Sequence, residues 1–316
     1  MEIVESFEQL HLNSSFLAIG VFDGVHLGHQ QIITGLVREA HKAAEPAVVM
    51  TFHPHPIVAL YDYKEPLYLT SLQQRNEILE GLGVDIVINQ SFTKDFSQQS
   101  GEEFLYRLKK HLNFRQLWAG YDFALGKNRQ ADVHALIEMS KALQYTLRKF
   151  DPIMLDNEVI SSSAIRALLM QGQVEKAARL LGRLYQVEGL VVKGDGRGTA
   201  LGIPTANVQP SVQTVIPKTG VYVSEAIVGG ETLKAITNIG IRPTFNGEHP
   251  HEVVMEVHIL DFHQDIYAQR IRVNFCVRLR DEMKFDQVAD LLAQVQRDIQ
   301  TARLYFQKLK LLDQPT

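Results

Sequence analysis

The chain has 316 residues, of which 45% are hydrophobic and 22% charged, and its formal net charge is -4. These values are typical of a folded globular protein and exclude a disordered, collagen-like or coiled-coil chain. A mildly acidic balance without a long basic run also argues against sequence-independent binding to nucleic acid. The first residues are acidic rather than basic, and no apolar stretch approaches the roughly 20 residues of a membrane helix, so we expect a cytoplasmic protein with no membrane partner.

The N-terminal half alternates short apolar runs with amphipathic segments. We predict strands near 16–22, 47–52, 84–88 and 116–119, and helices near 29–44, 72–81 and 101–112. Strands and helices in alternation indicate a parallel sheet that is covered on both faces. The fold class predicted for this half is therefore doubly wound α/β.

The pattern changes after a helical segment near 163–181. Short strands near 188–192, 220–228, 253–259 and 271–279 are separated by Gly and Pro, which is typical of a small antiparallel barrel or sandwich. We predict the barrel, closed by a helix near 286–311, and place the domains at 1–183 and 184–316.

Cys276 is the only cysteine, which excludes intrachain disulfides and zinc sites built from several thiolates. Alternation along 271–279 predicts that Cys276 lies on the polar face of its strand, as a passive residue.

A first candidate site follows the first predicted strand, where residues 20–29 read GVFDGVHLGH. Gly24 and Gly28 allow a ligand close to the backbone, and His26 and His29 can project together from a helix N-terminus towards phosphate. The pattern favours a nucleotide site. A glycine turn with two surface histidines is an alternative, and a zinc site completed by His53 and His55 is another.

A second candidate site lies in 193–207, which reads KGDGRGTALGIPTAN and places four glycines around Arg197. A flexible backbone beside an arginine can wrap polyphosphate, although a barrel corner loop would also use glycines. Thr205 and Asn207 add oxygen ligands of the kind that suits the Mg²⁺ carried by a nucleotide.

Glu256 and His258 alternate onto one face of the strand near 253–259. A carboxylate that faces inward is costly unless it is paired, which favours a functional role for Glu256. A salt bridge to Arg278 or Arg280 is the structural alternative.

The first site resembles the signature of adenylyltransferases related to the class I aminoacyl-tRNA synthetases. The segment 160–166, ISSSAIR, is similar to a motif of prokaryotic FMN adenylyltransferases. The resemblance implies that His26 and His29 stabilise ATP phosphates during attack on the α-phosphorus and that Arg166 faces the leaving pyrophosphate. Ser162 or Ser163 is expected to cap the helix that follows.

Two further segments resemble that family. Residues 51–56, TFHPHP, imply a flavin-binding role for His55 and Pro56, although a proline-stiffened turn explains them equally well. Residues 120–129, GYDFALGKNR, imply that Asp122 contacts nucleotide and that Phe123 stacks on flavin. Leu125 and Ala131 depart from the family's aromatic and glycine, and Ser163 replaces its usual threonine.

The second half resembles riboflavin kinase in order and spacing from Gly189 to about Asp298. Thr199 and Ala200 replace residues that are often basic, and Ile203 replaces a frequent phenylalanine. Together the two resemblances follow the domain order of the prokaryotic bifunctional riboflavin kinase/FAD synthetase family.

That family resemblance implies phosphorylation of riboflavin to FMN by MgATP, followed by adenylylation of FMN to FAD. Implied as catalytic are Glu256, His26, His29 and Arg166. Implied as nucleotide-binding are Gly20, Phe22, Asp23, Gly24, Gly28, Asp122, Ser162, Ser163, Gly194, Gly196, Arg197, Gly198 and Gly202. Implied as flavin-binding are His55, Pro56, Phe123, Asn238 and Arg280, and Thr205 and Asn207 are implied to hold Mg²⁺.

Two rival hypotheses remain open. One is a nucleotidyltransferase for another phosphorylated substrate, with the barrel as an accessory module. The other is a flavin-binding regulator that has lost turnover. The partners expected in either case are small molecules, and a monomer and a homo-oligomer are both compatible with the sequence.

Overall fold

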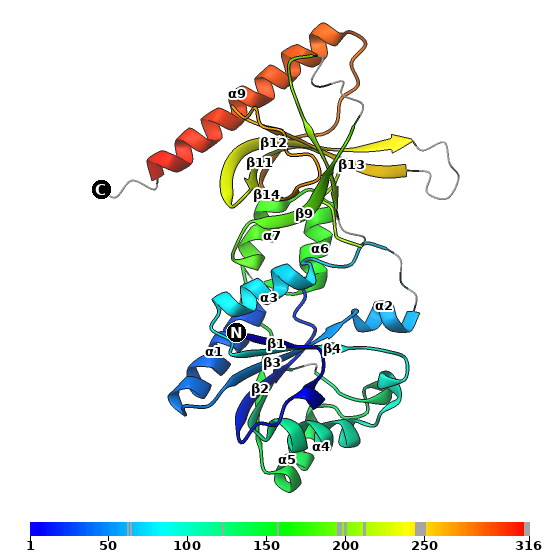
Figure 1. Cartoon of the computed structure of the whole chain (residues 1–316), viewed down its shortest axis with the longest axis vertical. Helices are drawn as coiled ribbons and strands as arrows, with labels where there is room; N and C mark the ends of the chain where they lie inside the picture. The colour runs from blue at the N-terminus through cyan, green and yellow to red at the C-terminus, as the bar shows by residue number, and fades with distance from the viewer. Residues whose placement is uncertain are drawn as a thin grey trace. The chain divides into compact units, whose positions relative to one another are not determined.

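A computed structural model describes residues 1–61, 63, 65–121, 123–156, 158–194, 198, 201–210, 213–243 and 251–312 (Figure 1). The chain divides into two compact units. The first is Met1–Glu65 with Leu69–Ser162, and the second is Pro66–Tyr68 with Ser163–Thr316. Over the described ranges, no helix combines the length and the apolar character that crossing a membrane requires.

The first unit is built on a six-stranded sheet in the order β1-β4-β3-β2-β5-β6, with every pair parallel. Its strands are β1 (Glu2–Val4), β2 (Ser15–Ile19), β3 (Ala47–His53), β4 (Ile86–Ser91), β5 (Phe114–Gly120) and β6 (Thr146–Phe150). Its helices are α1 (Leu27–Lys42), α2 (Pro56–Tyr61), α3 (Leu72–Gly81), α4 (Gly101–Leu112) and α5 (Val133–Leu143). A small hairpin, β7 (Met154–Leu155) and β8 (Glu158–Val159), precedes the second unit.

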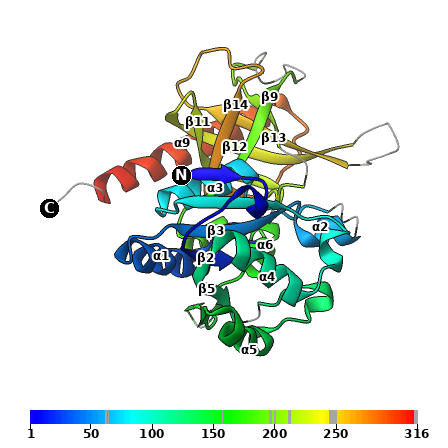
Figure 2. The same ribbon diagram turned by 60° about the horizontal axis from the view of Figure 1, so that its bottom comes forward.

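Both faces of this sheet are buried beneath helices. Leu17 and Ile19 of β2 pack with α4 and α5 in one apolar cluster, whereas Phe16 and Ala18 pack with α1 and α3 in another. In Figure 2, α1 and α4 accordingly lie on opposite sides of β2 and β3. This arrangement confirms the predicted doubly wound α/β fold.

The loop after β2 lies at the point where the strand order reverses. β2 pairs with β3 on one side and with β5 on the other, so the chain winds outward in both directions from it. Ligands of open parallel sheets bind beyond the carboxyl ends of the strands at such a point. Residues 20–26 therefore occupy the expected ligand position.

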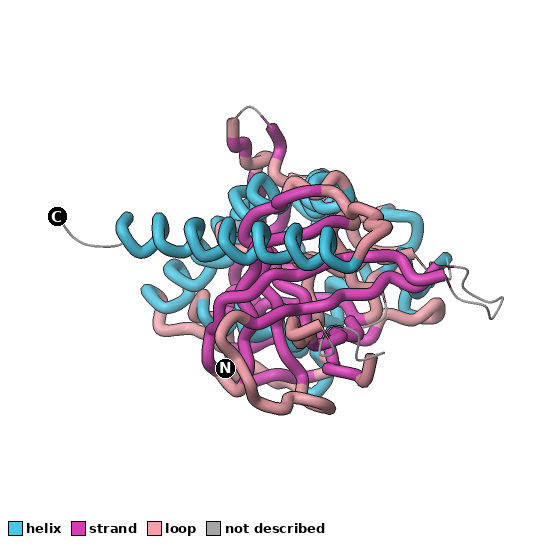
Figure 3. Tube along the Cα trace, turned by 90° about the horizontal axis from the view of Figure 1, so that it is seen from above, coloured by secondary structure: helices cyan, strands magenta, loops and turns pink. Residues whose placement is uncertain are grey.

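The second unit is a closed antiparallel barrel in the order β10-β13-β12-β11-β14-β9, as predicted. Its strands are β9 (Tyr185–Val192), β10 (Ala206–Pro210), β11 (Gly220–Val228), β12 (Glu231–Pro243), β13 (His251–Ile259) and β14 (Arg270–Arg280). Helices α6 (Ser162–Met170) and α7 (Val174–Leu181) precede the barrel, and α9 (Val288–Leu312) follows it. Figure 3 shows α9 as one long helix along the barrel strands.

The helical segment predicted near 163–181 is confirmed, and it consists of two helices. Gly172 separates α6 from α7 with a φ of +77°, in the left-handed region that ends a helix. A Cβ at this position would also lie 2.6 Å from the Arg278 Cδ.

The expected polar environment of Cys276 is also wrong. Register shifts between β11 and β14 interrupt the alternation, so Cys276 joins Val221, Val223 and Phe306 in the apolar cluster between the barrel and α9. Burial raises the pKa of its thiol to about 12. The thiol is therefore protonated at neutral pH, in keeping with a passive role.

Candidate active sites

The loop between β2 and α1 is folded tightly by residues in the left-handed region. Phe22, Gly24 and Val25 have φ values of +49°, +78° and +36°. A Cβ at Gly20 would lie 2.9 Å from the Phe22 ring, so glycine there lets the ring fold back over the strand end. The result is a compact turn that leads directly into α1.

His26 and His29 lie together at the start of α1. Their rings are stacked, with centroids 3.6 Å apart and an interplanar angle of 17°. His26 is the N-cap residue, and its Nδ1 accepts a hydrogen bond from the His29 backbone N–H at 3.3 Å. Because this Nδ1 needs its lone pair, a neutral His26 carries its proton on Nε2 and can donate it to a ligand. A Cβ at Gly28 would lie 3.0 Å from the His26 ring, which explains the glycine.

His29 is held in its neutral form. Burial, and secondarily the neighbouring His26, lower the pKa of His29 well below 6.5. Its Nδ1 is buried and has no hydrogen-bond partner among the residues that the structure describes. A buried polar atom without a partner is costly, and such atoms are enriched at functional sites.

Asp23 fastens the loop to the start of α3. Its carboxylate accepts hydrogen bonds from the backbone N–H groups of Leu69, at 3.0 and 3.2 Å, and Thr70, at 3.4 Å. The Thr70 hydroxyl in turn accepts from the Gly24 N–H at 3.2 Å, and the Ser162 hydroxyl donates to the Asp23 carbonyl at 2.9 Å. The predicted residues Asp23, Gly24 and Ser162 are thus brought together.

Arg166 and Ser163 belong to the second compact unit. The Arg166 Nε donates to the Leu67 carbonyl at 2.6 Å, within that unit. The expected serine cap is wrong in position, because α6 begins at Ser162 and both serines lie in its first turn.

Residues predicted to bind flavin in the segments 51–56 and 120–129 make local contacts. The His55 Nδ1 accepts from the Ile57 N–H at 3.1 Å, and Pro56 is the first residue of α2. Phe123 packs, partly buried, against the apolar cluster beneath α4 and α5. Asp122 lies outside the described residues.

The two residues that depart from the pattern of the resemblance lie opposite each other in one β-bridge. Leu125 and Ala131 pair through reciprocal backbone hydrogen bonds of 2.9 and 3.0 Å, and both are buried. A Cβ at Gly101 would lie 2.3 Å from the Ala131 Cβ, so Ala131 packs against the first residue of α4.

In the second unit, strand register brings four predicted residues into one row. Glu256 of β13 is paired with Asn207 of β10 on one side and with Asn238 of β12 on the other. Val221 of β11 is paired with both Asn238 and Arg280. Paired residues share a face, so the row across five neighbouring strands is Asn207, Glu256, Asn238, Val221 and Arg280.

A cavity of about 200 Å³ opens over this row. Among the residues that line it are Thr205, Asn238, Glu256, His258 and Arg280. The predicted sharing of one face by Glu256 and His258 is confirmed.

The face itself differs from the prediction. Met255, Val257 and Ile259 are buried, while Glu256 and His258 are half-buried on the opposite face of the strand. Glu256 therefore faces the cavity outside the barrel rather than the barrel core.

The expected salt-bridge alternative for Glu256 finds no support. Arg280 binds Asp298 of α9 through its Nε and Nη2, at 3.0 and 2.7 Å from Oδ2. Arg278 binds Asp281 at 2.6 Å. Over the described parts of the chain, no ion pair involves Glu256.

Gly194 and Gly198 lie close to the two expected metal ligands, Asn207 and Thr205 respectively. A Cβ at Gly194 would lie 2.1 Å from the Asn207 Nδ2. A Cβ at Gly198 would lie 2.5 Å from the Ile203 carbonyl oxygen and 3.2 Å from the Thr205 Oγ1. Glycine at both positions lets the loop backbone approach these side chains. Gly202 has a φ of +75° and open space around it, and Gly196 and Arg197 lie outside the described residues.

Thr205 also lines a second cavity, of about 380 Å³. Aromatic and polar residues of the segment 262–267 form its other wall. Thr205 thus stands between this cavity and the one that contains Glu256.

Thr205 and Asn207 suit a metal that arrives with phosphate oxygens rather than one held by protein alone. Both offer neutral oxygens, and the residues that the structure describes contain no cluster of three or more His, Cys, Asp or Glu side chains able to hold a metal. The same finding removes support for the zinc alternative at His53 and His55 among those residues.

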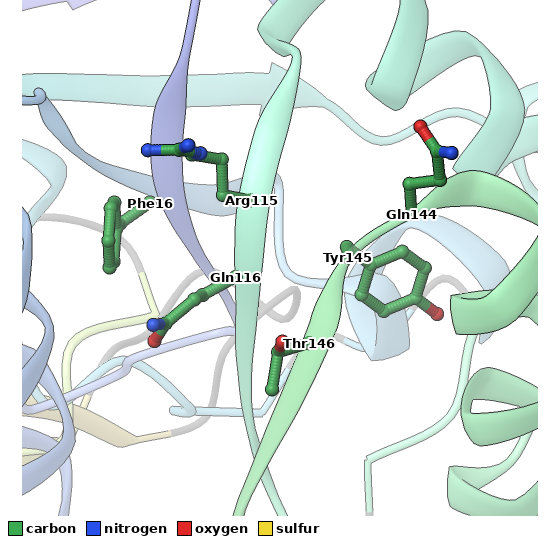
Figure 4. Close-up of a pocket in the computed structure, with 6 residues that line it drawn as sticks. All are labelled: Phe16, Arg115, Gln116, Gln144, Tyr145 and Thr146. Atoms are coloured by element: carbon green, nitrogen blue, oxygen red, sulfur yellow. The ribbon is translucent and has the colours of Figure 1, made fainter.

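Another hollow, of about 400 Å³, lies at the amino ends of strands β2, β5 and β6, whereas the β2–α1 loop follows the carboxyl end of β2 (Figure 4). Phe16, Arg115 and Thr146 are among the residues that line it. Arg115 is engaged by Glu45 at 2.6 Å. This hollow contains none of the predicted site residues.

Several functional candidates were not predicted from the sequence. Leu291, Val295 and Asp298 of α9 line the cavity over Glu256. Their spacing of four and three residues places them on one helix face, and this periodicity is the signal that could have found them. Arg75 and Thr51 also contact the β2–α1 loop, through the Val21 carbonyl, and no sequence pattern pointed to them.

Each half of the chain matches the model of a known protein family. Residues 8–164 match the family model described as FAD synthetase, and residues 181–306 match the model described as riboflavin kinase. The chain is 36% identical over 298 residues to the bifunctional riboflavin kinase/FMN adenylyltransferase of Bacillus subtilis (strain 168), covering 94% of each chain. It is 34% identical over 305 residues to the protein of the same name from Escherichia coli (strain K12), covering 96% of each.

A solved structure from Streptococcus pneumoniae, named a macrolide-efflux protein, superposes with a TM-score of 0.86 at 30% identity, covering 95% of this chain and 98% of that one. Its name describes a different activity from that of the relatives from Bacillus subtilis and Escherichia coli, and its likeness to this chain is one of fold. The relatives from Bacillus subtilis and Escherichia coli span nearly the full length of this chain, and the two family models fall on the two sites. The chain therefore belongs to the bifunctional riboflavin kinase/FMN adenylyltransferase family.

Proposed function

We propose that this enzyme converts riboflavin to FMN in its barrel and FMN to FAD at its β2–α1 loop. The observation that carries the kinase activity is the row of Asn207, Glu256, Asn238 and Arg280 beneath one cavity. The observation that carries the adenylyltransferase activity is the stacked pair of His26 and His29 at a helix N-terminus.

In the kinase reaction, riboflavin occupies the cavity over Glu256, with Asn238 and Arg280 as its polar partners. ATP occupies the cavity on the other side of Thr205. The 5′-hydroxyl oxygen of riboflavin attacks the γ-phosphorus, the bond to the β–γ bridging oxygen breaks, and the hydroxyl proton passes to Glu256. General-base catalysis of this kind contributes about 10²–10⁴-fold.

Magnesium enters as part of the MgATP substrate. Thr205 and Asn207 hold the ion beside the phosphates, while the backbone of Gly194, Gly196, Gly198 and Gly202 and the Arg197 side chain cover them. The contacts of Gly194 with Asn207 and of Gly198 with Thr205 support this assignment. Neutral protein ligands leave the charge of the metal to the phosphates and reduce their repulsion of the nucleophile.

In the adenylyltransferase reaction, an oxygen of the FMN phosphate attacks the α-phosphorus of ATP and pyrophosphate leaves. His26 and His29 bind the triphosphate through hydrogen bonds, the N-terminus of α1 binds it through its dipole, and Arg166 binds the pyrophosphate. Gly20, Phe22, Asp23, Gly24, Gly28, Asp122, Ser162 and Ser163 shape the nucleotide site, and His55, Pro56 and Phe123 bind the flavin. Catalysis here consists of positioning and charge neutralisation.

The proposed functional domains are 1–183 and 184–316, and the cytoplasm is the proposed location. Riboflavin, FMN and ATP are the proposed partners, without nucleic acid or membrane.

Incubation of the purified chain with riboflavin and MgATP, followed by chromatographic separation of flavins, tests the proposal. We expect FMN first and FAD after it. Riboflavin that is bound but unchanged would instead identify a flavin-binding regulator. Adenylylation of another phosphorylated compound without FMN or FAD would identify a different nucleotidyltransferase.

A further inference from the structure

The carbonyl group of Val21, at the root of the β2–α1 loop, is held by two buried side chains. The Thr51 hydroxyl of β3 donates to it at 2.8 Å, and the Arg75 Nη1 of α3 donates to it at 3.1 Å. Thr51 is fully buried, and Arg75 is only 3% exposed. Neither residue has a role in the reaction described above.

The hydrogen bond from Arg75 brings a positive charge to this buried carbonyl. Hydrogen bonds in which the donor is ionised are stronger than those between neutral groups. The positive charge of Arg75 therefore strengthens its hold on the Val21 carbonyl. Its influence also reaches His53, because burial and then the charge of Arg75 lower the pKa of that histidine.

The charge of Arg75 can act on the N–H of Phe22, because this group shares a peptide unit with the Val21 carbonyl. The C=O of Val21 and the N–H of Phe22 belong to one planar unit and point in opposite directions. With the carbonyl directed towards Arg75 and Thr51, the N–H is directed away from them. A cationic donor on the carbonyl polarises the peptide and strengthens its N–H as a donor to an anion.

The loop also needs an anchor at this position. Phe22 has a φ of +49°, a left-handed conformation that is unfavourable for a residue other than glycine. Such a conformation persists when its surroundings hold it. Two donors on the preceding carbonyl provide this restraint.

We infer that Arg75 is a positioning residue for adenylyl transfer, which, together with Thr51, orients and polarises the Val21–Phe22 peptide for binding of the ATP triphosphate. The inference rests on the proposed adenylyltransferase function of the first unit. It concerns ATP binding at this loop and leaves the barrel reaction unaffected.

Steady-state kinetics of FAD formation from supplied FMN test this role, with riboflavin phosphorylation by the same preparation as an internal control. Arg75→Gln removes the charge, and its amide nitrogen ends two atoms short of the position of the Arg75 Nη1. We expect it to lower kcat/KM for ATP by about 10-fold to 100-fold. Arg75→Lys retains the charge and should recover part of this loss. Riboflavin phosphorylation should stay within about twofold in both variants, because the barrel has its own ATP site.

Two further variants make the test specific. Arg38→Gln changes an arginine of α1 whose side chain is 77% exposed, and it should leave both reactions unchanged. Thr51→Val removes the neutral donor on the same carbonyl, and it should raise the KM for ATP less than Arg75→Gln does. Should Arg75→Gln fail to fold, as judged by its thermal unfolding transition, Thr51→Val carries the test, and an unchanged KM for ATP in that variant overturns the inference.

An NMR titration of His53 tests separately whether the charge of Arg75 lies where the structure places it. Arg75→Gln should raise the pKa of His53, and Arg75→Lys should restore it towards the parental value. Parental kcat/KM for ATP in Arg75→Gln, or equal losses in the Gln and Lys variants, would overturn the inference. A parental chain that makes no FAD would instead overturn the proposed function, so the two failures are distinguishable.

Discussion

Glu256 stands between two asparagines on neighbouring strands, opposite Asn207 and Asn238. The two arginines considered as its ion-pair partners bind other carboxylates, Arg280 that of Asp298 and Arg278 that of Asp281. This leaves the carboxylate available to accept a proton from a ligand in the cavity. Substitution of Glu256 is therefore the most direct test of the proposed kinase site.

Glu256→Gln keeps the size of the side chain and its hydrogen-bonding capacity but removes its basicity. We expect riboflavin phosphorylation to fall by about 10²–10⁴-fold, whereas FAD formation from supplied FMN stays at the parental rate. Separate assays with riboflavin and with FMN check this. Equal loss of both activities would contradict two independent sites.

His29→Ala is the matching variant in the other unit. It removes one of the two stacked imidazoles at the start of α1, so FAD formation should fall by about 10²-fold or more while FMN formation persists. The same two assays check this, and unchanged FAD output would reject the role assigned to His29.

The lowered pKa of His29 also makes a prediction about stability. The unfolded chain binds a proton at this residue near pH 6.5, whereas burial and His26 keep the folded form neutral to lower pH. The unfolded state therefore binds more protons below pH 6.5, so the free energy of unfolding falls as the pH decreases from about 6.5 and is constant above it with respect to this group. Urea unfolding at several pH values should show a smaller decrease in His29→Asn than in the parent.

At the scale of elements, α9 completes the cavity over Glu256 because an ion pair fixes it to β14. Asp298 is 6% exposed and accepts hydrogen bonds from both Arg280 and Gln294. Leu291 and Val295 of the same helix line the cavity. The position of the helix thus depends on a buried charge pair.

Asp298→Ala leaves Arg280 without its carboxylate. We expect the barrel to lose about 2 kcal/mol of stability and the KM for riboflavin to increase, because both Arg280 and α9 border the cavity. Thermal unfolding and kinase assays measure the two effects. Gln296→Ala, on an exposed position in the middle of the same helix, is the control and should change neither.

Element boundaries show why local patterns are incomplete. The alternation of strands and helices predicts β2, β3, β4 and β5, because each carries a buried apolar run. The strands β1 and β6 escape prediction, since β1 has only three residues and β6 has no fully buried side chain. Both are edge strands, which are recruited by pairing with a neighbour rather than by their own pattern.

At the scale of the whole molecule, one chain carries two folds, each with its own proposed ATP site. A shared chain does not require transfer of FMN from one site to the other, and we expect FMN to be released and rebound. When riboflavin and MgATP are supplied together with an excess of labelled FMN, the FAD formed should carry label in proportion to the labelled fraction of free FMN. FAD that excludes the label would indicate direct transfer.

The sequence alone determined the fold class of both halves and, through its resemblance to a known family, the order of the two activities. These features are local: hydrophobic period, glycine spacing and short motifs are encoded in contiguous residues. Even the pairing of His26 with His29 follows from their spacing at a helix start.

Only the tertiary structure decided which distant residues meet. The row of Asn207, Glu256, Asn238 and Arg280 depends on the register of strands far apart in the sequence, and a slip of one residue would turn each side chain to the other face. Likewise, a bulge places Cys276 in an apolar cluster. Arg75 contacts Val21, which lies 54 residues earlier in the sequence. Contacts of this kind are set by packing and pairing between elements, which no local pattern specifies.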